Sequence, residues 1–376
     1  MTEPVVIAAR RTPIGRDGGG LRAHTVDELA APVLRAVLDD VGAARIGHID
    51  DVVLGNVFGP GGNPARVAAL RAGLGVDVPG VTVDRQCASG LAAVAQAAAY
   101  VRAGQGEAYL AGGVESASTA PRRSWPTDPP TPYSRAPFAP AEFGDPDMGP
   151  AADLVAAEAG ISRTRQDAFA VRSHERAVAA QRAGRFDREL VAVGGVADDE
   201  RPRPGFTVER LSRFRPAFTA DGTATAANSC GVNDGAAAVL VVSERLRARL
   251  GVPGLRLEAS ATRACDPARL GLGAVPAMRE VLRSGTPDVV EFNEAFAGQT
   301  LACLDAVGID EHRVSPDGGA IALGHPWGAS GAVLVVRLFS RLVCQGPSVT
   351  GTAATGVAAL SAGGGVGVAT RWTVTR

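Results

Sequence analysis

Lysine is missing from this chain of 376 residues: all 38 of its lysine-plus-arginine positions are arginine. Schiff-base aldolases and pyridoxal enzymes both need a lysine amine, and so does the Walker phosphate loop. The composition therefore excludes these three kinds of chemistry. The accompanying excess of alanine, arginine and glycine is typical of coding bias and indicates no function.

Strong net charge and metal-ligand spacings are lacking as well. The net charge of −1 gives no electrostatic reason to expect nucleic-acid binding. The five cysteines are odd in number and widely spaced, and the chain has no CxxC, HxxxH or HxH motif. We therefore predict reduced thiols and no metal site.

Targeting signals are not recognisable in the sequence. The start, MTEPVVIAARRTP, differs from a secretory signal, and we find no apolar run of about 20 residues that predicts a membrane span. We therefore expect a cytoplasmic protein with no membrane partner. With 46% hydrophobic residues, the length suits two domains or a little more.

Short repeated segments occur in the same order in both halves of the chain. Residues 51–56 (DVVLGN) resemble 288–293 (DVVEFN), and the ASG at 88–90 recurs at 329–331, each time before an apolar run. Apolar segments at 5–9 and 255–259 open the two halves. This pattern predicts two copies of one α/β unit.

Apolar, β-branched runs alternate with helical patterns, which predicts α/β layers around mainly buried sheets. We expect helices over 26–41, 64–73, 89–103, 274–283, 294–306 and 329–344, and strands over 5–9, 50–54, 80–84, 108–112, 237–242, 287–292, 347–351 and 366–373. Residues 121–149 are proline-rich and aperiodic, and a charged helical segment follows at 151–183. We interpret roughly 119–215 as an insertion in the first half.

Cys87 is the cysteine best placed for chemistry. It lies between a strand and a helix of small residues, so unpaired amides and the helix dipole would favour its thiolate. For the other four cysteines, a buried structural role is the better interpretation, since free cysteine is among the most buried residue types. They are Cys230, Cys265, Cys303 and Cys344.

His325 occupies the position in the second repeat that corresponds to Cys87. Between Gly324 and Pro326 it is poorly placed for packing and well placed to exchange a proton with a thiol. Asn293 stands at a strand end, where it could orient a water or a carbonyl, or simply cap a helix. Glu294 is interpreted as an acidic residue in the first turn of that helix.

The small residues at 360–370 (LSAGGGVGVAT) could bring backbone amides to a developing oxyanion. A dinucleotide-binding loop is the competing interpretation. It fails because no helix follows and no GxGxxG can be aligned there.

Together these segments resemble the thiolase family over almost the whole chain. The motifs are ARRTPIG (9–15), GNPARVAALRAGL (62–74), DRQCASGLAAV (84–94), AGGVESAS (111–118), DMG (147–149), FRPAF (214–218), NSCGVNDGAAA (228–238), FNEAFA (292–297), GGAIALGHPWGASG (318–331) and SAGGG (361–365). So many ordered motifs make the resemblance specific.

The resemblance implies the thiolase fold, a duplicated five-layer αβαβα arrangement with an inserted loop domain. It divides the chain into an N-terminal half (1–118 and 216–250), a loop or lid domain (119–215) and a C-terminal half (251–376). It also implies a homodimer or homotetramer, coenzyme A thioesters as substrates and no tightly bound cofactor.

In the family scheme, Cys87 would carry the acyl group and His325 would activate it. His325 and a water held by Asn293 would form one oxyanion site, and the amides of Cys87 and Gly363 the other. The resemblance further places four residues along the coenzyme A channel. These are Arg215, Met148, Ala295 and Phe296.

The chain departs from the family pattern at Ser361, where the family has a second catalytic cysteine that removes the α-proton of the incoming thioester. A serine hydroxyl is a much poorer base. Asp317 stands where asparagine is usual, Val366 replaces a polar residue, and Ala259 replaces a serine said to contact the pantetheine arm. Residues 150–153 also differ from the family.

Three functions therefore stay open. The first is an acyl-CoA C-acyltransferase that forms or cleaves the carbon–carbon bond of 3-ketoacyl-CoA. The second is a specialised acyltransferase or a decarboxylative condensing enzyme of a biosynthetic pathway, which could accept carrier-protein thioesters and would need no base at Ser361. The third is a catalytically impaired acyl-CoA-binding subunit. An engineered Cys→Ser change would also explain Ser361, but the other scattered departures favour natural divergence.

Overall fold

The computed structural model describes residues 2–345 and 354–376. Its main feature is a mixed sheet with the strand order β10-β11-β12-β9-β1-β8-β5-β3-β4, to which β2 is added beside β8. The strands of this sheet are β1 (Pro4–Arg11), β2 (Gly15–Arg16), β3 (Asp51–Gly55), β4 (Gly80–Val83), β5 (Ala108–Ser116), β8 (Asn233–Ser243), β9 (Gly254–Ala264), β10 (Val289–Phe292), β11 (Thr355–Ala362) and β12 (Val366–Thr375).

The predicted duplication is confirmed by the order of the strands. Reading outward from the centre, β1-β8-β5-β3 in the first half corresponds to β9-β12-β11-β10 in the second, and β4 extends the first half. The two halves join where β1 pairs with β9, through the partners Val5–Arg256 and Val6–Leu255. The repeated segments at 51–56 and 288–293 begin just before or within the equivalent strands β3 and β10.

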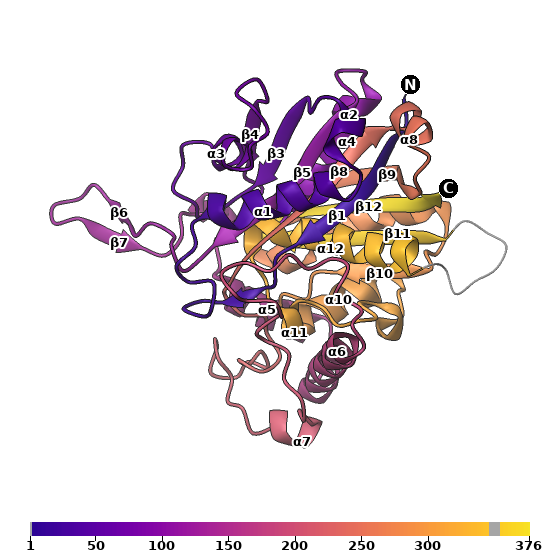
Figure 1. Cartoon of the computed structure of the whole chain (residues 1–376). Helices are drawn as coiled ribbons and strands as arrows, with labels where there is room; N and C mark the ends of the chain where they lie inside the picture. The colour runs from indigo at the N-terminus through magenta and orange to yellow at the C-terminus, as the bar shows by residue number, and fades with distance from the viewer. Residues whose placement is uncertain (1, 346–353) are drawn as a thin grey trace.

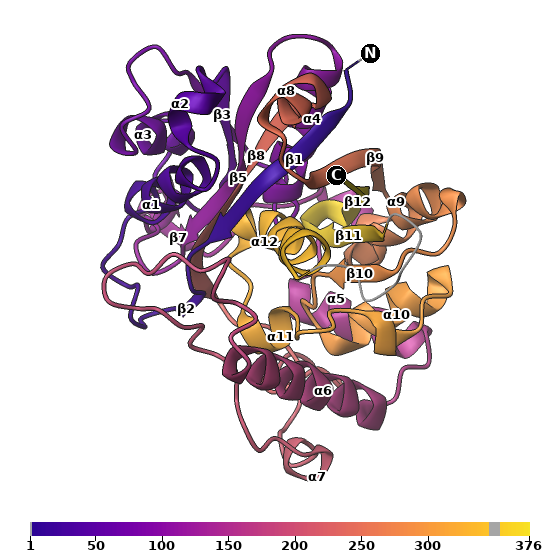
Figure 2. The same ribbon diagram turned by 45° about the vertical axis from the view of Figure 1, so that its right-hand side comes forward.

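Helices cover both outer faces of the sheet and fill the space between its two halves (Figures 1 and 2). Helices α4 (Ser89–Arg102) and α12 (Trp327–Phe339) lie in the middle, α12 against β5, β8 and β11. Helices α1 (Val26–Asp39), α2 (Ala43–Ile46), α3 (Pro64–Arg71) and α8 (Glu244–Leu250) lie outside the first half, and α9 (Ala274–Val281) and α10 (Ala297–Val307) outside the second. These are the five layers of the predicted αβαβα fold.

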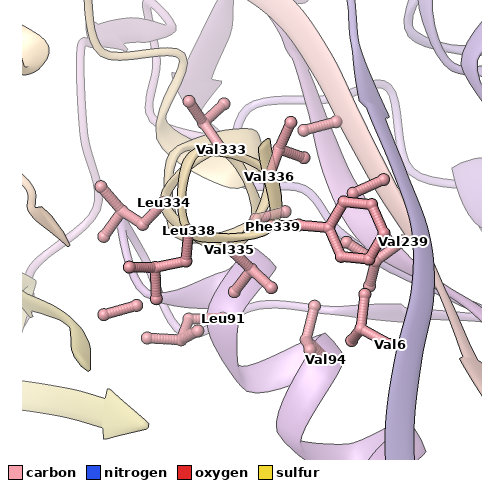
Figure 3. Close-up of a cluster of buried hydrophobic side chains, with 14 of the residues drawn as sticks. Val6, Leu91, Val94, Val239, Val333, Leu334, Val335, Val336, Leu338 and Phe339 are labelled. Carbon is pink, nitrogen blue, oxygen red and sulfur yellow. The ribbon is translucent and has the colours of Figure 1, made fainter. Parts of the chain in front are cut away.

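Helix α12 is the centre of the largest hydrophobic core. Figure 3 shows it end-on, with Val335 and Leu338 directed toward Leu91 of α4 and Phe339 toward Val239 of β8. The stretch Trp327–Cys344, which includes α12, is long and apolar enough to cross a membrane, but 78% of it is buried inside the protein. Its place in the core accounts for its apolar composition.

Glycines in the two repeated ASG segments let α4 and α12 approach closely. A Cβ atom on Gly90 would lie 2.7 Å from the carbonyl oxygen of Gly328, and one on Gly331 would lie 2.4 Å from the backbone nitrogen of Leu91. Real Cβ atoms do not come so near to backbone atoms, so larger residues would push the helices apart. The small-residue pattern thus sets the distance between the N-terminal ends of both helices.

Most predicted helices and strands are present, but several observed elements were not predicted, among them α8, β9 and β11. Strand β11 was not predicted, because its sequence TGVAALSA is rich in small residues with little strand preference. Strand β9 extends to Ala264, beyond the predicted apolar segment, through polar residues on its exposed side. The strand predicted over 347–351 lies outside the described residues.

The predicted insertion, residues 119–215, contributes no strand to the main sheet. It forms the hairpin β6 (Arg123–Trp125) and β7 (Thr131–Tyr133), which projects from the body in Figure 1, and then the helices α5 (Met148–Glu158), α6 (Arg163–Arg182) and α7 (Val208–Leu211). The short helix α11 (Ala320–Leu323) packs on α6. The domain boundaries at residues 119, 215 and 251 stay a prediction.

Candidate active site

Cys87 lies in a tight turn between β4 and α4, one residue before the helix cap. Gln86, just before it, has φ 49°, a left-handed conformation that costs a non-glycine residue roughly 1–2 kcal/mol. Ser89 stabilises this turn, because its hydroxyl donates to the Gln86 carbonyl (2.6 Å) and accepts from the Arg85 amide (2.7 Å). The turn presents the Cys87 thiol at the N-terminal end of α4.

The pKa of the Cys87 thiol is raised to about 12, first by burial and then by the nearby Cys230. The expectation that the helix end holds Cys87 as a thiolate is therefore wrong for the free protein, because desolvation outweighs the favourable backbone amide. Cys87 is a neutral thiol at neutral pH, and something must remove its proton before it can act as a nucleophile.

His325 is placed at the start of α12 by several hydrogen bonds. Its amide donates to Oδ1 of Asn233 (2.9 Å), and its Nδ1 lies 2.6 Å from the hydroxyl of Ser330. Burial lowers the pKa of the imidazole to about 4, so the ring is neutral at pH 7. A neutral imidazole held in this way can accept a proton through its other ring nitrogen, Nε2.

Asn293 lies beside that nitrogen, with its Nδ2 atom 3.5 Å from Nε2 of His325. The capping role considered for Asn293 is wrong, because Phe296 caps α10. Glu294 is likewise not in the first turn of the helix: its buried carboxylate accepts from the Ser173 hydroxyl (2.6 Å) and the Ile321 amide (3.3 Å). Glu294 therefore ties α6 to α11.

One cavity of about 290 Å³ brings six of the nine predicted site residues together, and its walls are mostly apolar. These six are Cys87, His325, Ser361, Met148, Ala295 and Phe296. Asn293 reaches this group through His325. Gly363 is buried next to Phe138, whose ring also lines the cavity, and a Cβ on Gly363 would lie 3.0 Å from that ring. Arg215 is exposed and does not line the cavity.

Ser361 lines the cavity, but its hydroxyl already has partners. It donates to the Gly271 carbonyl (2.7 Å) and accepts from the Ala274 amide (3.0 Å). The thiol of Cys303 lies 4.0 Å away and points at the same carbonyl. Ser361 thus links β11 to the start of α9, which is a structural role.

Several residues of the cavity wall were not found from the sequence. Cys230, interpreted there as structural, lines the cavity together with the aromatic residues Phe58 and Trp327. Ser330, which contacts His325 but does not line this cavity, was missed too, although its place in the repeated ASG segment was a usable signal. Ala259 lies on β9, partly buried against a hydrophobic core, and is not among the residues that line this cavity; the contact with a pantetheine arm stays a prediction.

Asp317 has an electrostatic role that the sequence did not reveal. Its carboxylate is fully buried and pairs with Arg337 (2.6 Å), Arg185 (2.7 Å) and Arg341 (3.0 Å). The pairs with three arginines account for an aspartate at this position, because its charge helps Glu189 to compensate the buried Arg337 and also binds the partly exposed Arg185 and Arg341.

Comparison with known proteins identifies the family. The thiolase N-terminal domain matches residues 4–245, and the thiolase C-terminal domain matches residues 253–373. The chain therefore belongs to the thiolase family.

Its relatives match over nearly their whole length. The chain is 40% identical to an acetyl-CoA acetyltransferase of Pseudomonas aeruginosa, covering 98% of each chain, and 39% identical to one of Cupriavidus necator, again covering 98% of each. Its structure resembles the crystal structure of the Bacillus anthracis acetyl-CoA acetyltransferase, with a TM-score of 0.90, 33% identity and coverage of 100% of this chain and 99% of that one.

Proposed function

We propose that this thiolase is an acyl-CoA C-acyltransferase, which forms or cleaves the carbon–carbon bond of 3-ketoacyl-CoA through an acyl group on Cys87. One observation carries the proposal: Cys87 and His325 each lie two residues before the equivalent helices α4 and α12, and both line the same cavity. The names of the relatives, acetyl-CoA acetyltransferases, support the same activity.

In the first step, neutral His325 takes the proton of the Cys87 thiol as the sulfur attacks the thioester or ketone carbonyl. The bond from that carbonyl carbon to its leaving group then breaks. When the leaving group is coenzyme A, it departs with the proton from His325. When the sulfur has attacked a ketone, the leaving group is the enolate of a thioester, and the proton taken from Cys87 balances the one that its α-carbon gains. Pairing the proton transfer with attack avoids a free thiolate, which burial disfavours. Amides of Cys87 and Gly363 would face the developing oxyanion.

The second step needs a carbanion at the α-carbon of the other thioester, and here Ser361 matters. Its hydroxyl is engaged with Gly271 and Ala274, and among the described residues no carboxylate or histidine hydrogen-bonds to it. This favours a second candidate, decarboxylative condensation, in which loss of CO₂ from a malonyl thioester leaves the carbanion without a base.

The first experiment tests acyl transfer itself. The protein is mixed with acetyl-CoA or acetoacetyl-CoA and its intact mass is measured by mass spectrometry, with Cys87→Ala as the blank. We expect an acetyl adduct on the wild type and none on the variant, together with acetyl-CoA release when free coenzyme A is added. A protein that gains no adduct would instead be an acyl-CoA-binding subunit without catalysis, and the proposal would be wrong.

The second experiment separates the two candidates. Acetylated protein is supplied with acetyl-CoA, malonyl-CoA or a malonyl carrier protein, and the condensation product is measured. Turnover with acetyl-CoA supports the first candidate, whereas turnover with malonyl thioesters alone supports the second. Ser361→Cys should raise the acetyl-CoA reaction at least about tenfold, because a thiolate is a much stronger base than a hydroxyl.

We further infer a homodimer or homotetramer. Among the residues that the structure describes, no strand pairs with the outer edge of β4, whose residues are half-exposed and come directly before the turn that carries Cys87. This edge can pair with another chain. Light scattering on the purified protein tests this, and a monomer at micromolar concentration would contradict it.

A further inference from the structure

Two aromatic side chains stand together in the cavity wall close to His325. Phe58 follows β3, and Trp327 is the first residue of α12, two positions after His325. Their ring centroids are 4.5 Å apart at an angle of 48°. The guanidinium of Arg123 lies over Phe58, 5.6 Å from its centroid, so that Phe58 packs against both Trp327 and Arg123.

A buried carboxylate fixes the distance between the two aromatic residues. Glu115, at the end of β5, accepts from the amides of Val57 (3.1 Å) and Phe58 (3.0 Å) and also from the amide of Gly328 (3.0 Å), next to Trp327. Glu115 is completely buried. One side chain therefore holds the loop that carries Phe58 and the first turn of α12 together.

We propose that Phe58 and Trp327 form the wall that ends the acyl-binding part of this cavity and make it select short acyl groups on Cys87 over long ones. This inference rests on the proposed acyl-Cys87 function and adds its substrate class. Trp327 is only two residues from His325, and two residues span at most about 7 Å. The wall therefore stands near the place where the acyl carbonyl would be attacked.

The restraint at Glu115 makes the wall selective. A long acyl chain could enter only if the rings moved apart, which would break hydrogen bonds to a buried carboxylate. A single methylene group in an apolar pocket changes specificity about 10- to 200-fold. A fixed aromatic wall can therefore separate acetyl from hexanoyl thioesters strongly, whereas a loop free to move could not.

The test compares acylation of Cys87 by acetyl-, butyryl-, hexanoyl- and octanoyl-CoA, followed by intact mass spectrometry over time. For the wild type we expect acetyl-CoA to react at least about tenfold faster than hexanoyl-CoA. Trp327→Leu removes the ring but keeps an apolar side chain, and should raise the ratio of the hexanoyl rate to the acetyl rate at least about tenfold.

Trp125→Leu is the matched control, because Trp125 also stacks on an aromatic residue, Tyr133, at 4.5 Å, but lies exposed on the β6–β7 hairpin. It should keep the wild-type ratio. Phe58→Leu opens the same wall from the other side and serves if Trp327→Leu does not fold. An unchanged ratio in the folded variant overturns the proposal.

Glu115→Gln tests the positioning role. It keeps a similar shape but replaces one acceptor oxygen with a donor, and should lower the acetyl-to-hexanoyl ratio. If Glu115 only stabilised the fold, the variant would react more slowly with both thioesters to the same extent, and the ratio would stay unchanged. If no thioester of any length acylates Cys87, the proposed function itself is wrong; if hexanoyl-CoA reacts as fast as acetyl-CoA, only this inference is wrong.

Discussion

Cys87 and His325 are both neutral in the free protein, which has a measurable consequence. Burial raises the pKa of Cys87 to about 12 and lowers the pKa of His325 to about 4. We predict that alkylation of Cys87 by iodoacetamide is slow and keeps rising from pH 6 to pH 9, since the thiolate fraction grows throughout that range. Peptide mass spectrometry would follow the reaction, with Cys87→Ala as the blank. A plateau above a midpoint near pH 7 would instead indicate a thiolate–imidazolium pair.

Asp317 offers a second prediction at the scale of single residues. Asp317→Asn removes a buried carboxylate from its pairs with Arg337, Arg185 and Arg341 and should cost about 1–3 kcal/mol. The loss stays below that of a fully uncompensated buried charge because Glu189 still pairs with Arg337 and the other two arginines are partly exposed. Urea unfolding would measure this loss. Asp40→Asn is the control, because its pair with Arg10 is partly exposed and should contribute less than about 1 kcal/mol. Equal losses in both variants would contradict the assigned role of Asp317.

At the scale of elements, the contact between α4 and α12 depends on glycine. A Cβ on Gly331 would lie 2.4 Å from the backbone of Leu91, so Gly331→Ala should cost about 1–3 kcal/mol by overpacking. It should also slow acylation, because the two helix ends carry Cys87 and His325. Gly235→Ala is a matched control: its Cβ would meet nothing nearer than 3.4 Å. Thermal unfolding and Cys87 acylation of both variants would check the prediction.

The sequence predicted elements better than contacts between elements. The proximity of Cys87 and His325 could be predicted from the sequence, because the repeated ASG segments place both residues at the same point of equivalent units. The wall formed by Phe58 and Trp327 could not, since it depends on Glu115 bonding two segments that are distant along the chain. The structural role of Ser361 could not be predicted either, because its hydroxyl bonds to backbone atoms of Gly271 and Ala274, and backbone atoms leave no signal in the sequence.

At the scale of the whole molecule, buried histidines and buried carboxyl groups change the free energy of unfolding with pH in opposite directions. Burial lowers the pKa of His174 and His325 to about 4, so their contribution rises with pH and is complete above about 6.5. Burial raises the pKa of Glu115 and Glu294 to about 7 and that of Glu291 to about 8. These carboxyls bind protons more tightly when folded, so stability falls as pH rises through their pKa values.

The range from pH 6.5 to pH 8 is therefore governed mainly by Glu291, and we predict that the free energy of unfolding decreases across it. Glu291→Gln removes the titrating group, so its slope in this range should be shallower than that of the wild type. Urea unfolding at several pH values would measure both slopes, with the exposed Glu175→Gln as control. A variant that keeps the wild-type slope would show that another group titrates there.

The pairing of the first strand with residues from the middle of the chain has a consequence for biosynthesis. In β1, Ala9 pairs with Val239 of β8, so the strand has no neighbour in the sheet until the ribosome has added roughly 230 further residues. At about 5–20 residues per second, that takes on the order of ten seconds or more. During this time the apolar segment PVVIAARR is exposed on the nascent chain and prone to aggregate. Binding of a chaperone to it in that interval would raise the yield of folded enzyme in the cell.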